Sequence, residues 1–274
     1  MEYVEVEKYQ FRCHIRGRSH HPPLLFLHGF MGDRHEFDPV MDLLCEQFYC
    51  MAVDLPGHGK TQVSADDRYY TMADTAEGLI QVLKAIGIQQ CCVIGYSMGG
   101  RLALYLTLRF PKYFLKTVLE SASPGLKTEA ERNQRIQKDH HLAHRLESED
   151  FSAFLAQWYR QPLFATLPKH PNFELMLNQR LQNNPLNLAR SLRHLSTGCQ
   201  PSLWEDLHRN TVPLLLLAGE LDTKFIGINT EMAERSPCAI LRKVDRCGHN
   251  IHFENPGLFV HVIRQFLTQP FDSK

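Results

Sequence analysis

The sequence predicts an α/β protein in which helices flank a mostly parallel sheet and one helical segment is inserted. Three observations support this fold class. Short apolar runs alternate with helical periods, no internal repeat or Gly/Ser linker divides the chain, and the strand signal is lost in one central stretch. With 274 residues, of which 43% are hydrophobic and 22% charged, the chain can form one sizeable core.

Six short apolar runs are typical of buried parallel strands. They cover residues 24–27, 48–53, 91–94, 115–119, 214–218 and 239–244. Apolar residues at three- and four-residue spacing between Leu79 and Ile86 predict a crossover helix over residues 74–86, which ends at Gly87. A second helical period covers residues 101–109, and residues 256–267 predict a closing helix with Asn255 as its cap.

The stretch from about residue 124 to residue 207 differs from the rest of the chain. It is rich in Arg, Gln, His and Asn, and it has helical periodicity with little strand signal. We therefore expect residues 1–123 and 208–274 to form the α/β core, and residues 124–207 to form a helical cap inserted into it.

The charge balance excludes some classes of partner. Lys plus Arg and Asp plus Glu both number 30, so no global field attracts nucleic acid or an anionic membrane, and we expect neither partner. The longest aliphatic run, residues 214–218, is far shorter than the roughly 20 apolar residues that cross a bilayer. The acidic, polar first ten residues differ from a secretory signal, so we expect a cytoplasmic protein. The sequence predicts no oligomeric state.

A Gly-x-Ser-x-Gly pattern, Gly95-Tyr96-Ser97-Met98-Gly99, lies between a predicted strand and a predicted helix. Small glycines allow a sharp turn that lifts the Ser97 hydroxyl out at the end of the strand, above the N-terminus of the helix. This pattern alone also fits a glycine-rich turn that packs a helix on a sheet. Further segments favour the catalytic interpretation.

Two of these segments concern stabilisation of an oxyanion. His28-Gly29-Phe30 follows the first buried strand and resembles the oxyanion loop of α/β hydrolases. The resemblance makes the N–H groups of Phe30 and Met98 the expected oxyanion donors. His58 lies in a strand-end turn of the same family, where we expect a structural role.

The remaining members of a triad follow in the order Ser, Asp, His that this fold uses. Asp222 lies just after the buried run 214–218 and has the family position for the acid, with Glu220 as the alternative. His249 lies in a Gly-His loop after the last predicted strand, where its imidazole can reach Ser97 while Asp222 orients it. We therefore predict an α/β-hydrolase fold with the catalytic residues Ser97, Asp222 and His249.

The other histidines suggest little chemistry. His140, His141 and His144 could place two imidazoles on one helical face, but no Glu or Cys ligand set is near, so a solvated face is favoured. We predict no metal, and the triad chemistry requires no cofactor.

Arginines suggest the substrate class. Arg101 follows the glycines of the elbow, and the cap contributes many more, although any one of them could face solvent. Guanidinium groups bind carboxylates through two parallel hydrogen bonds, so we expect a small-molecule polycarboxylate substrate.

The chain resembles the 2-succinyl-6-hydroxy-2,4-cyclohexadiene-1-carboxylate (SHCHC) synthases of menaquinone and phylloquinone biosynthesis over nearly its whole length. The shared motifs are Leu27-His-Gly-Phe-Met-Gly-Asp33, Asp54-Leu-Pro-Gly-His-Gly59, Gly95-Tyr-Ser-Met-Gly-Gly-Arg101, Pro124-Gly-Leu126, Trp158-Tyr159, Gln161-Pro162, Gln200-Pro201, Asp222-Thr-Lys-Phe225 and Gly248-His-Asn-x-His252. The resemblance implies that substrate is bound by Tyr96, Arg101, Arg135, Trp158 and Arg180.

Some of these assignments have alternatives or depart from the family pattern. In the variable cap, Arg132 or Arg190 could replace Arg135 or Arg180. Phe37 stands where the family usually has Trp, and we expect it to reshape the pocket wall. Pro185 interrupts the cap segment after Arg180.

The resemblance implies an elimination: Ser97 removes a ring proton beside the succinyl ketone and pyruvate leaves. The main alternative is a carboxylesterase or C–C bond hydrolase that uses Ser97 as a covalent nucleophile. A non-catalytic receptor on this scaffold is disfavoured by the complete triad, and nucleic-acid binding has only the local basic run 132–145 in its favour.

Overall fold

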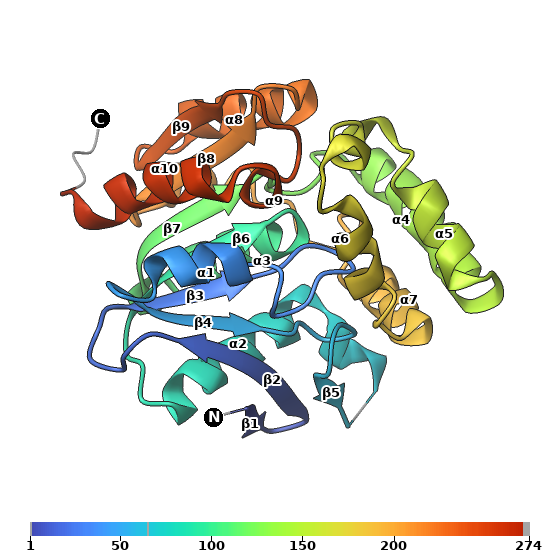
Figure 1. Ribbon diagram of the computed structural model, residues 1–274, viewed down its shortest axis with the longest axis horizontal. Helices are drawn as coiled ribbons and strands as arrows, with labels where there is room; N and C mark the ends of the chain where they lie inside the picture. Colours follow the sequence, from blue (N-terminus) through green and yellow to red (C-terminus); the bar gives the residue numbers. More distant parts are fainter. Residues whose placement is uncertain (1, 65, 271–274) are drawn as a thin grey trace.

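One sheet organises the part of the protein that the computed structural model describes, residues 2–64 and 66–270. Its strands are β1 (Tyr3–Val6), β2 (Tyr9–Arg16), β3 (Pro23–Leu27), β4 (Tyr49–Val53), β5 (Gln62–Val63), β6 (Cys91–Tyr96), β7 (Phe114–Glu120), β8 (Leu214–Gly219) and β9 (Ala239–Val244). Their order is β1-β2-β4-β3-β6-β7-β8-β9, with β5 paired to β2. From β4 to β9 the neighbours are parallel, so the carboxyl ends of these strands meet at one edge (Figure 1).

All six predicted strands are present, as β3, β4, β6, β7, β8 and β9. The sequence prediction missed β1, β2 and β5, which pair antiparallel at the other end of the sheet. Strand β2 alternates buried and half-buried residues, and polar side chains such as Gln10 and Arg12 interrupt its apolar positions. A strand with one partly solvated face lacks the continuous apolar run that identified the others.

Helices cover both faces of the sheet. On one face α2 (Met72–Ala85), α3 (Met98–Arg109) and α8 (Thr223–Arg235) contribute Leu79, Leu102 and Met232 to a buried apolar cluster. On the other face, α1 (Asp38–Leu44), α9 (Ile251–Glu254) and α10 (Pro256–Thr268) form a second cluster. Two short 3₁₀ helices, η1 (Asp67–Tyr70) and η2 (Pro111–Tyr113), also lie in the core part of the chain. The result is the mostly parallel α/β-hydrolase architecture expected from the sequence.

The segment between β7 and β8 is helical. It contains α4 (Glu129–Ser148), α5 (Phe151–Trp158), η3 (Pro162–Phe164), η4 (Leu167–Lys169), α6 (Phe173–Arg180), α7 (Pro185–His194) and η5 (Leu207–Arg209). Figure 1 shows α4 to α7 grouped beside the edge of the sheet where the parallel strands end. Leu203 N–H donates to Pro124 O at 2.8 Å and Trp204 Nε1 donates to Gly125 O at 3.0 Å, which ties the two ends of the segment together. We call residues 124–207 the cap, and these limits stay a prediction.

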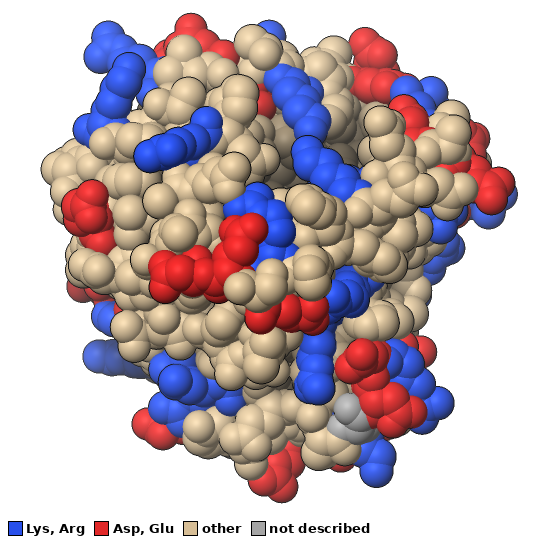
Figure 2. Space-filling model, turned by 90° about the vertical axis from the view of Figure 1, so that its right-hand side faces the viewer, with Lys and Arg blue, Asp and Glu red and all other residues tan. Residues whose placement is uncertain are grey.

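The surface of the cap side carries charges of both signs. Figure 2 shows Lys and Arg interspersed with Asp and Glu over this face. Among the described residues, no helix combines the length and apolar character needed to cross a membrane. The cytoplasmic location stays a prediction.

Candidate active site

The turn between β6 and α3 holds Ser97 in a backbone conformation that non-glycine residues rarely adopt, with φ 49° and ψ −104°. The flanking glycines make the turn possible. A Cβ on Gly95 would lie 2.3 Å from Gly99 O, and one on Gly99 would lie 2.1 Å from Leu27 O. Ser97 N–H donates to Glu120 O at 2.9 Å, which anchors the strained residue to the neighbouring strand end. Ser97 is thereby held at the carboxyl edge of the sheet.

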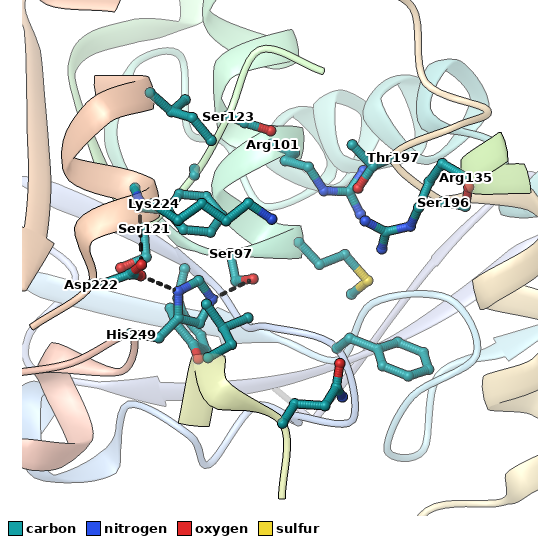
Figure 3. A pocket seen from close by; sticks show the side chains of 18 of the residues that line it. Ser97, Arg101, Ser121, Ser123, Arg135, Ser196, Thr197, Asp222, Lys224 and His249 are labelled. Atoms are coloured by element: carbon teal, nitrogen blue, oxygen red, sulfur yellow. Dashed lines mark hydrogen bonds and ion pairs between the residues drawn. The ribbon is translucent and has the colours of Figure 1, made fainter. Parts of the chain in front are cut away.

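The three residues predicted as a triad lie in one hydrogen-bonded chain (Figure 3). His249 Nδ1 lies 2.7 Å from Asp222 Oδ2, and His249 Nε2 lies 3.2 Å from Ser97 Oγ. Because the Asp222 carboxylate can only accept, Nδ1 carries the proton and Nε2 presents its lone pair to the Ser97 hydroxyl. The alternative acid, Glu220, instead accepts from Arg246 N–H at 3.0 Å and is exposed.

The loop that carries His249 is held by Glu254. This carboxylate accepts from Gly248 N–H at 2.9 Å and from Asn250 N–H at 3.3 Å, so it binds the backbone on both sides of the histidine. The Phe225 ring packs against the imidazole at a centroid distance of 4.7 Å. Burial raises the pKa of Glu254, although the two N–H groups oppose this shift.

The oxyanion loop is a tight turn after β3. Gly32 N–H donates to Gly29 O at 3.0 Å, which leaves Phe30 at the first central position and Met31, with φ 65°, at the second. Phe30 and Met98 both line the cavity beside Ser97. The Met98 N–H is at the first position of α3, where the helix itself provides no acceptor. Both residues thus line the cavity that Ser97 also lines, and their role as oxyanion donors stays a prediction.

Arg180 of the cap is bound to this loop. It forms an ion pair with Glu36, and its Nη1 donates to Met31 O at 3.2 Å. Glu36 in turn accepts from Gly29 N–H at 2.7 Å. Both charged side chains are more than nine-tenths buried. Burial opposes both charges, but Glu36 raises the pKa of Arg180 and Arg180 lowers that of Glu36, so both stay ionised.

A cavity of about 660 Å³ lies between the sheet edge and the cap. It is lined by the whole predicted set of site residues, namely Ser97, Asp222, His249, Phe30, Met98, Tyr96, Arg101, Arg135, Trp158 and Arg180. The ring of Trp158 packs against the ring of Phe30 at a centroid distance of 5.5 Å. The ring of Tyr96 lies under Gly29, where a Cβ would come within 2.6 Å of it.

Arg101 and Arg135 approach the cavity from the core and from the cap, respectively (Figure 3). Arg101 Nη1 donates to Gln200 Oε1 at 2.5 Å and Nη2 donates to Leu195 O at 2.9 Å, so its partners are neutral. Burial, and then the neighbouring Arg135, lower the pKa of Arg101 to about 9. Arg135 Nε donates to both carboxylate oxygens of Asp139, at 2.9 and 2.8 Å.

The cap alternatives lie elsewhere. Arg132 donates to Gly198 O at 3.2 Å, and the half-exposed Arg190 lies 3.8 Å from Asp67. Neither is among the described residues that line the cavity, whereas Arg135 and Arg180 are. Pro185 is the first residue of α7, so it starts a new helix after Arg180 rather than disturbing α6.

The expectation for Phe37 is wrong. Phe37 is 1% exposed and is not among the described residues that line the cavity. Its ring stacks on His252 at 4.2 Å and packs near Phe26 at 5.1 Å. It therefore belongs to the buried cluster that α1, α9 and α10 form beneath the site.

Sequence reasoning gave no role to several residues at the site. Lys224 and Phe225 line the cavity, and Glu120 accepts from His252 Nδ1 at 2.6 Å directly behind the elbow. Asp222 also caps α8 by accepting from Phe225 N–H at 3.2 Å. The Asp222-Thr-Lys-Phe225 motif held a signal, since a cation two residues after the acid must lie near the triad. Glu36 left no comparable signal.

One group of described residues has the proximity of metal ligands. The ligand atoms of His14, His35 and Asp38 lie within 4.8 Å of one another, outside the active-site cavity. Arg16 already supplies a cation there, because its Nε donates to His14 Nε2 at 3.0 Å and its Nη2 lies 3.7 Å from Asp38. His140, His141 and His144 do not form such a group. We assign no metal role to either set.

His58 fits a structural role in its turn. It is 1% exposed, its Nδ1 lies 3.2 Å from Pro56 O, and its ring packs against Phe30 at 5.5 Å. Burial lowers its pKa well below the ordinary value, which keeps the imidazole neutral.

Comparison with known proteins places this geometry in a family. Residues 22–256 match the family model described as alpha/beta hydrolase fold. The SHCHC synthase of Citrobacter koseri is 36% identical, over 92% of this chain and 96% of that protein. The chloroplastic protein PHYLLO of Arabidopsis thaliana is 32% identical over 98% of this chain, which corresponds to 17% of that longer protein.

A solved structure agrees with these relatives. The structure of MenH from S. aureus has a TM-score of 0.88 and 32% identity, with 96% of this chain and 98% of that chain covered. The hydrolase alternative is not favoured by these relatives, since the C. koseri protein is named a synthase. The chain belongs to the α/β-hydrolase fold family and, within it, to the SHCHC synthases.

Proposed function

We propose that the protein is an SHCHC synthase, which eliminates pyruvate from 2-succinyl-5-enolpyruvyl-6-hydroxy-3-cyclohexene-1-carboxylate in menaquinone or phylloquinone biosynthesis. One observation carries the proposal within this family. The hydrogen-bonded chain from Asp222 through His249 to Ser97 opens into a cavity whose walls carry several cations. A base and a polycarboxylate pocket are what this elimination requires.

The first step is proton abstraction. His249 Nε2 accepts the Ser97 hydroxyl proton, while Asp222 stabilises the imidazolium that forms. Ser97 Oγ then takes the ring proton beside the succinyl ketone, and the electron pair of the broken C–H bond forms an enolate. The N–H groups of Phe30 and Met98 are the donors proposed to stabilise the enolate oxygen.

The second step expels the leaving group. The enolate electrons shift through the ring alkene and break the C–O bond to the enolpyruvyl group, which leaves as enolpyruvate. That group takes up a proton at carbon and becomes pyruvate, so the proton removed from the ring is balanced by the one gained. No bond between Ser97 and substrate forms, and no cofactor is needed.

The substrate has three carboxylates, which is the reason to place Arg101 and Arg135 at the pocket. The Nη groups of Arg135 are left for a ligand because only its Nε contacts Asp139. Tyr96 and Trp158 supply apolar surface against the ring. Arg180 contacts Glu36 and Met31, so its binding role would run partly through the loop that holds Phe30.

Pyruvate release tests the proposal. The unstable precursor is generated from isochorismate and 2-oxoglutarate by the upstream synthase, and pyruvate is measured by its coupled reduction to lactate. We expect release at a rate proportional to the concentration of this protein. If the precursor is untouched while simple esters are cleaved with a burst of acyl product, the proposal is wrong and Ser97 acts as a covalent nucleophile.

A further inference from the structure

The charges around the cavity are not equally available to a ligand. Arg180 is paired with Glu36, and Lys127 Nζ is 2.6 Å from Glu231. Arg135 forms an ion pair with Asp139 through its Nε. Two of the three arginines expected to bind carboxylates are therefore partly or wholly neutralised by protein carboxylates, which leaves the three substrate carboxylates short of free cations.

Lys224 is a free cation on the cavity wall. Among the described residues, no carboxylate forms an ion pair with it, and its ammonium lies 5.5 Å from the centroid of the Phe225 ring. Figure 3 shows its side chain reaching into the pocket above Ser97, on the side toward Arg101. Burial, and then the positive charge of Arg135, lower the pKa of Lys224, and the Asp222 carboxylate only partly opposes this shift.

The position of Lys224 is tied to the triad. It is the second residue of α8, and Asp222, the N-cap of that helix, is bonded to His249. Phe225, the next residue, packs against the imidazole ring. The N-terminus of a helix also carries a partial positive charge, which adds to the attraction for an anion at this point. The Lys224 side chain therefore starts from the same helix end that carries the acid of the triad.

We propose that Lys224 binds a substrate carboxylate on the α8 side of Ser97, across the pocket from Arg135, and so helps to select polycarboxylate substrates. This inference rests on the proposed function, because it assigns a partner to one of the three carboxylates. Lys224 then takes the binding role expected of Arg180, which instead contacts the oxyanion loop through Glu36 and Met31.

Lys224→Gln tests the inference. We expect KM to rise about 10- to 100-fold, the loss typical of a hydrogen bond to a charged group, with a smaller change in kcat. Lys224→Arg should recover most of the affinity because it keeps the charge. Lys169→Gln, an exposed cap residue outside the described cavity lining, removes the same charge from the protein and should leave KM unchanged. Melting temperatures of all variants should match that of the wild type.

A result in which Lys224→Gln and Lys169→Gln give the same KM would overturn the inference. So would a rise in KM that appears in Lys138→Gln, the other unpaired lysine of the cavity wall, and not in Lys224→Gln. Binding of succinate, measured by calorimetry, separates this inference from the proposed function. If the wild type releases no pyruvate, the proposed function is wrong. The inference about Lys224 still requires that Lys224→Gln binds succinate more weakly than the wild type does.

Discussion

The two walls of the active-site cavity are built by different means. On the sheet side, Ser97, Asp222 and His249 follow strands β6, β8 and β9, and backbone hydrogen bonds such as Ser97 N–H to Glu120 O hold them. On the cap side, the guanidinium groups of Arg135 and Arg180 project from helices and are oriented by carboxylates. The catalytic residues are thus placed by strand ends and by hydrogen bonds to the main chain, including those that Glu254 accepts, whereas ion pairs between side chains set the charge pattern of the pocket.

The largest expected effect comes from the sheet side. Ser97→Ala removes the proposed base and should lower the rate of pyruvate release by at least about 10³-fold. The melting temperature should stay close to that of the wild type, because the turn is held by glycines and backbone bonds rather than by the hydroxyl. Retention of a wild-type rate would exclude Ser97 from the proton abstraction.

The buried pair on the cap side should affect stability most. Glu36→Gln leaves the Arg180 charge buried without its counter-ion, and should reduce the free energy of unfolding in urea by about 3–5 kcal/mol. Glu36→Gln combined with Arg180→Met removes both charges and should recover part of this loss. An unchanged urea midpoint for the single variant would show that the pair contributes nothing to the cap–core contact.

A substitution of Arg135 that keeps the positive charge should weaken substrate binding and have little effect on folding. Arg135→Lys can still pair with Asp139 but loses the planar fork, so KM should rise about tenfold. Arg135→Ala should also lower stability, because the Asp139 side chain is 1% exposed and would lose its partner. Arg132→Lys, outside the described cavity lining, is the matched control, and an equal effect there would argue for the other cap register.

The smallest effect concerns Glu254, which joins the His249 loop to α9. The pKa of Glu254 is raised in the folded protein, so the native state holds this proton at a pH where the unfolded chain has lost it. Its stabilising contribution is complete below the unfolded pKa and is lost as pH rises through the folded one.

Glu254→Gln removes this dependence. Urea unfolding measured from about pH 4 upward should show the wild type losing stability relative to the variant as pH rises through this range. The variant should also turn over several-fold more slowly, since one amide beside His249 loses its acceptor. A constant difference in stability across the pH series would contradict the role given to the buried carboxyl group.

Prediction from the sequence succeeded where the cause of a structural feature lies within one short segment. The elbow glycines are needed because Gly95 and Gly99 leave no room for a Cβ, and a local pattern can reveal such a need. Asp222 and His249 each follow an apolar run that is a strand. The N-terminal strands were missed because Gln10, Arg12 and similar polar side chains break the run on the solvated face of β2.

Reasoning from the sequence was weaker where the partner lies far along the chain. Arg180 and Glu36 are 144 residues apart, and nothing in either segment shows that they pair. For the same reason the sequence did not reveal that Arg180 is paired with a buried carboxylate, or that Phe37 lies away from the pocket wall. Lys224 was visible in its motif, but its lack of a counter-ion emerges only when all neighbouring segments are in place.

The sequence by itself determined the parallel sheet, the strained turn at Ser97 and the order of the catalytic residues, because hydrophobic periodicity and glycine requirements act over a few neighbouring residues. Only the tertiary structure decided which cations remain free in the cavity. Electrostatic pairing depends on distances of a few ångströms between side chains that the chain brings together from the cap, the oxyanion loop and α8, and those distances arise only when the core and cap have packed.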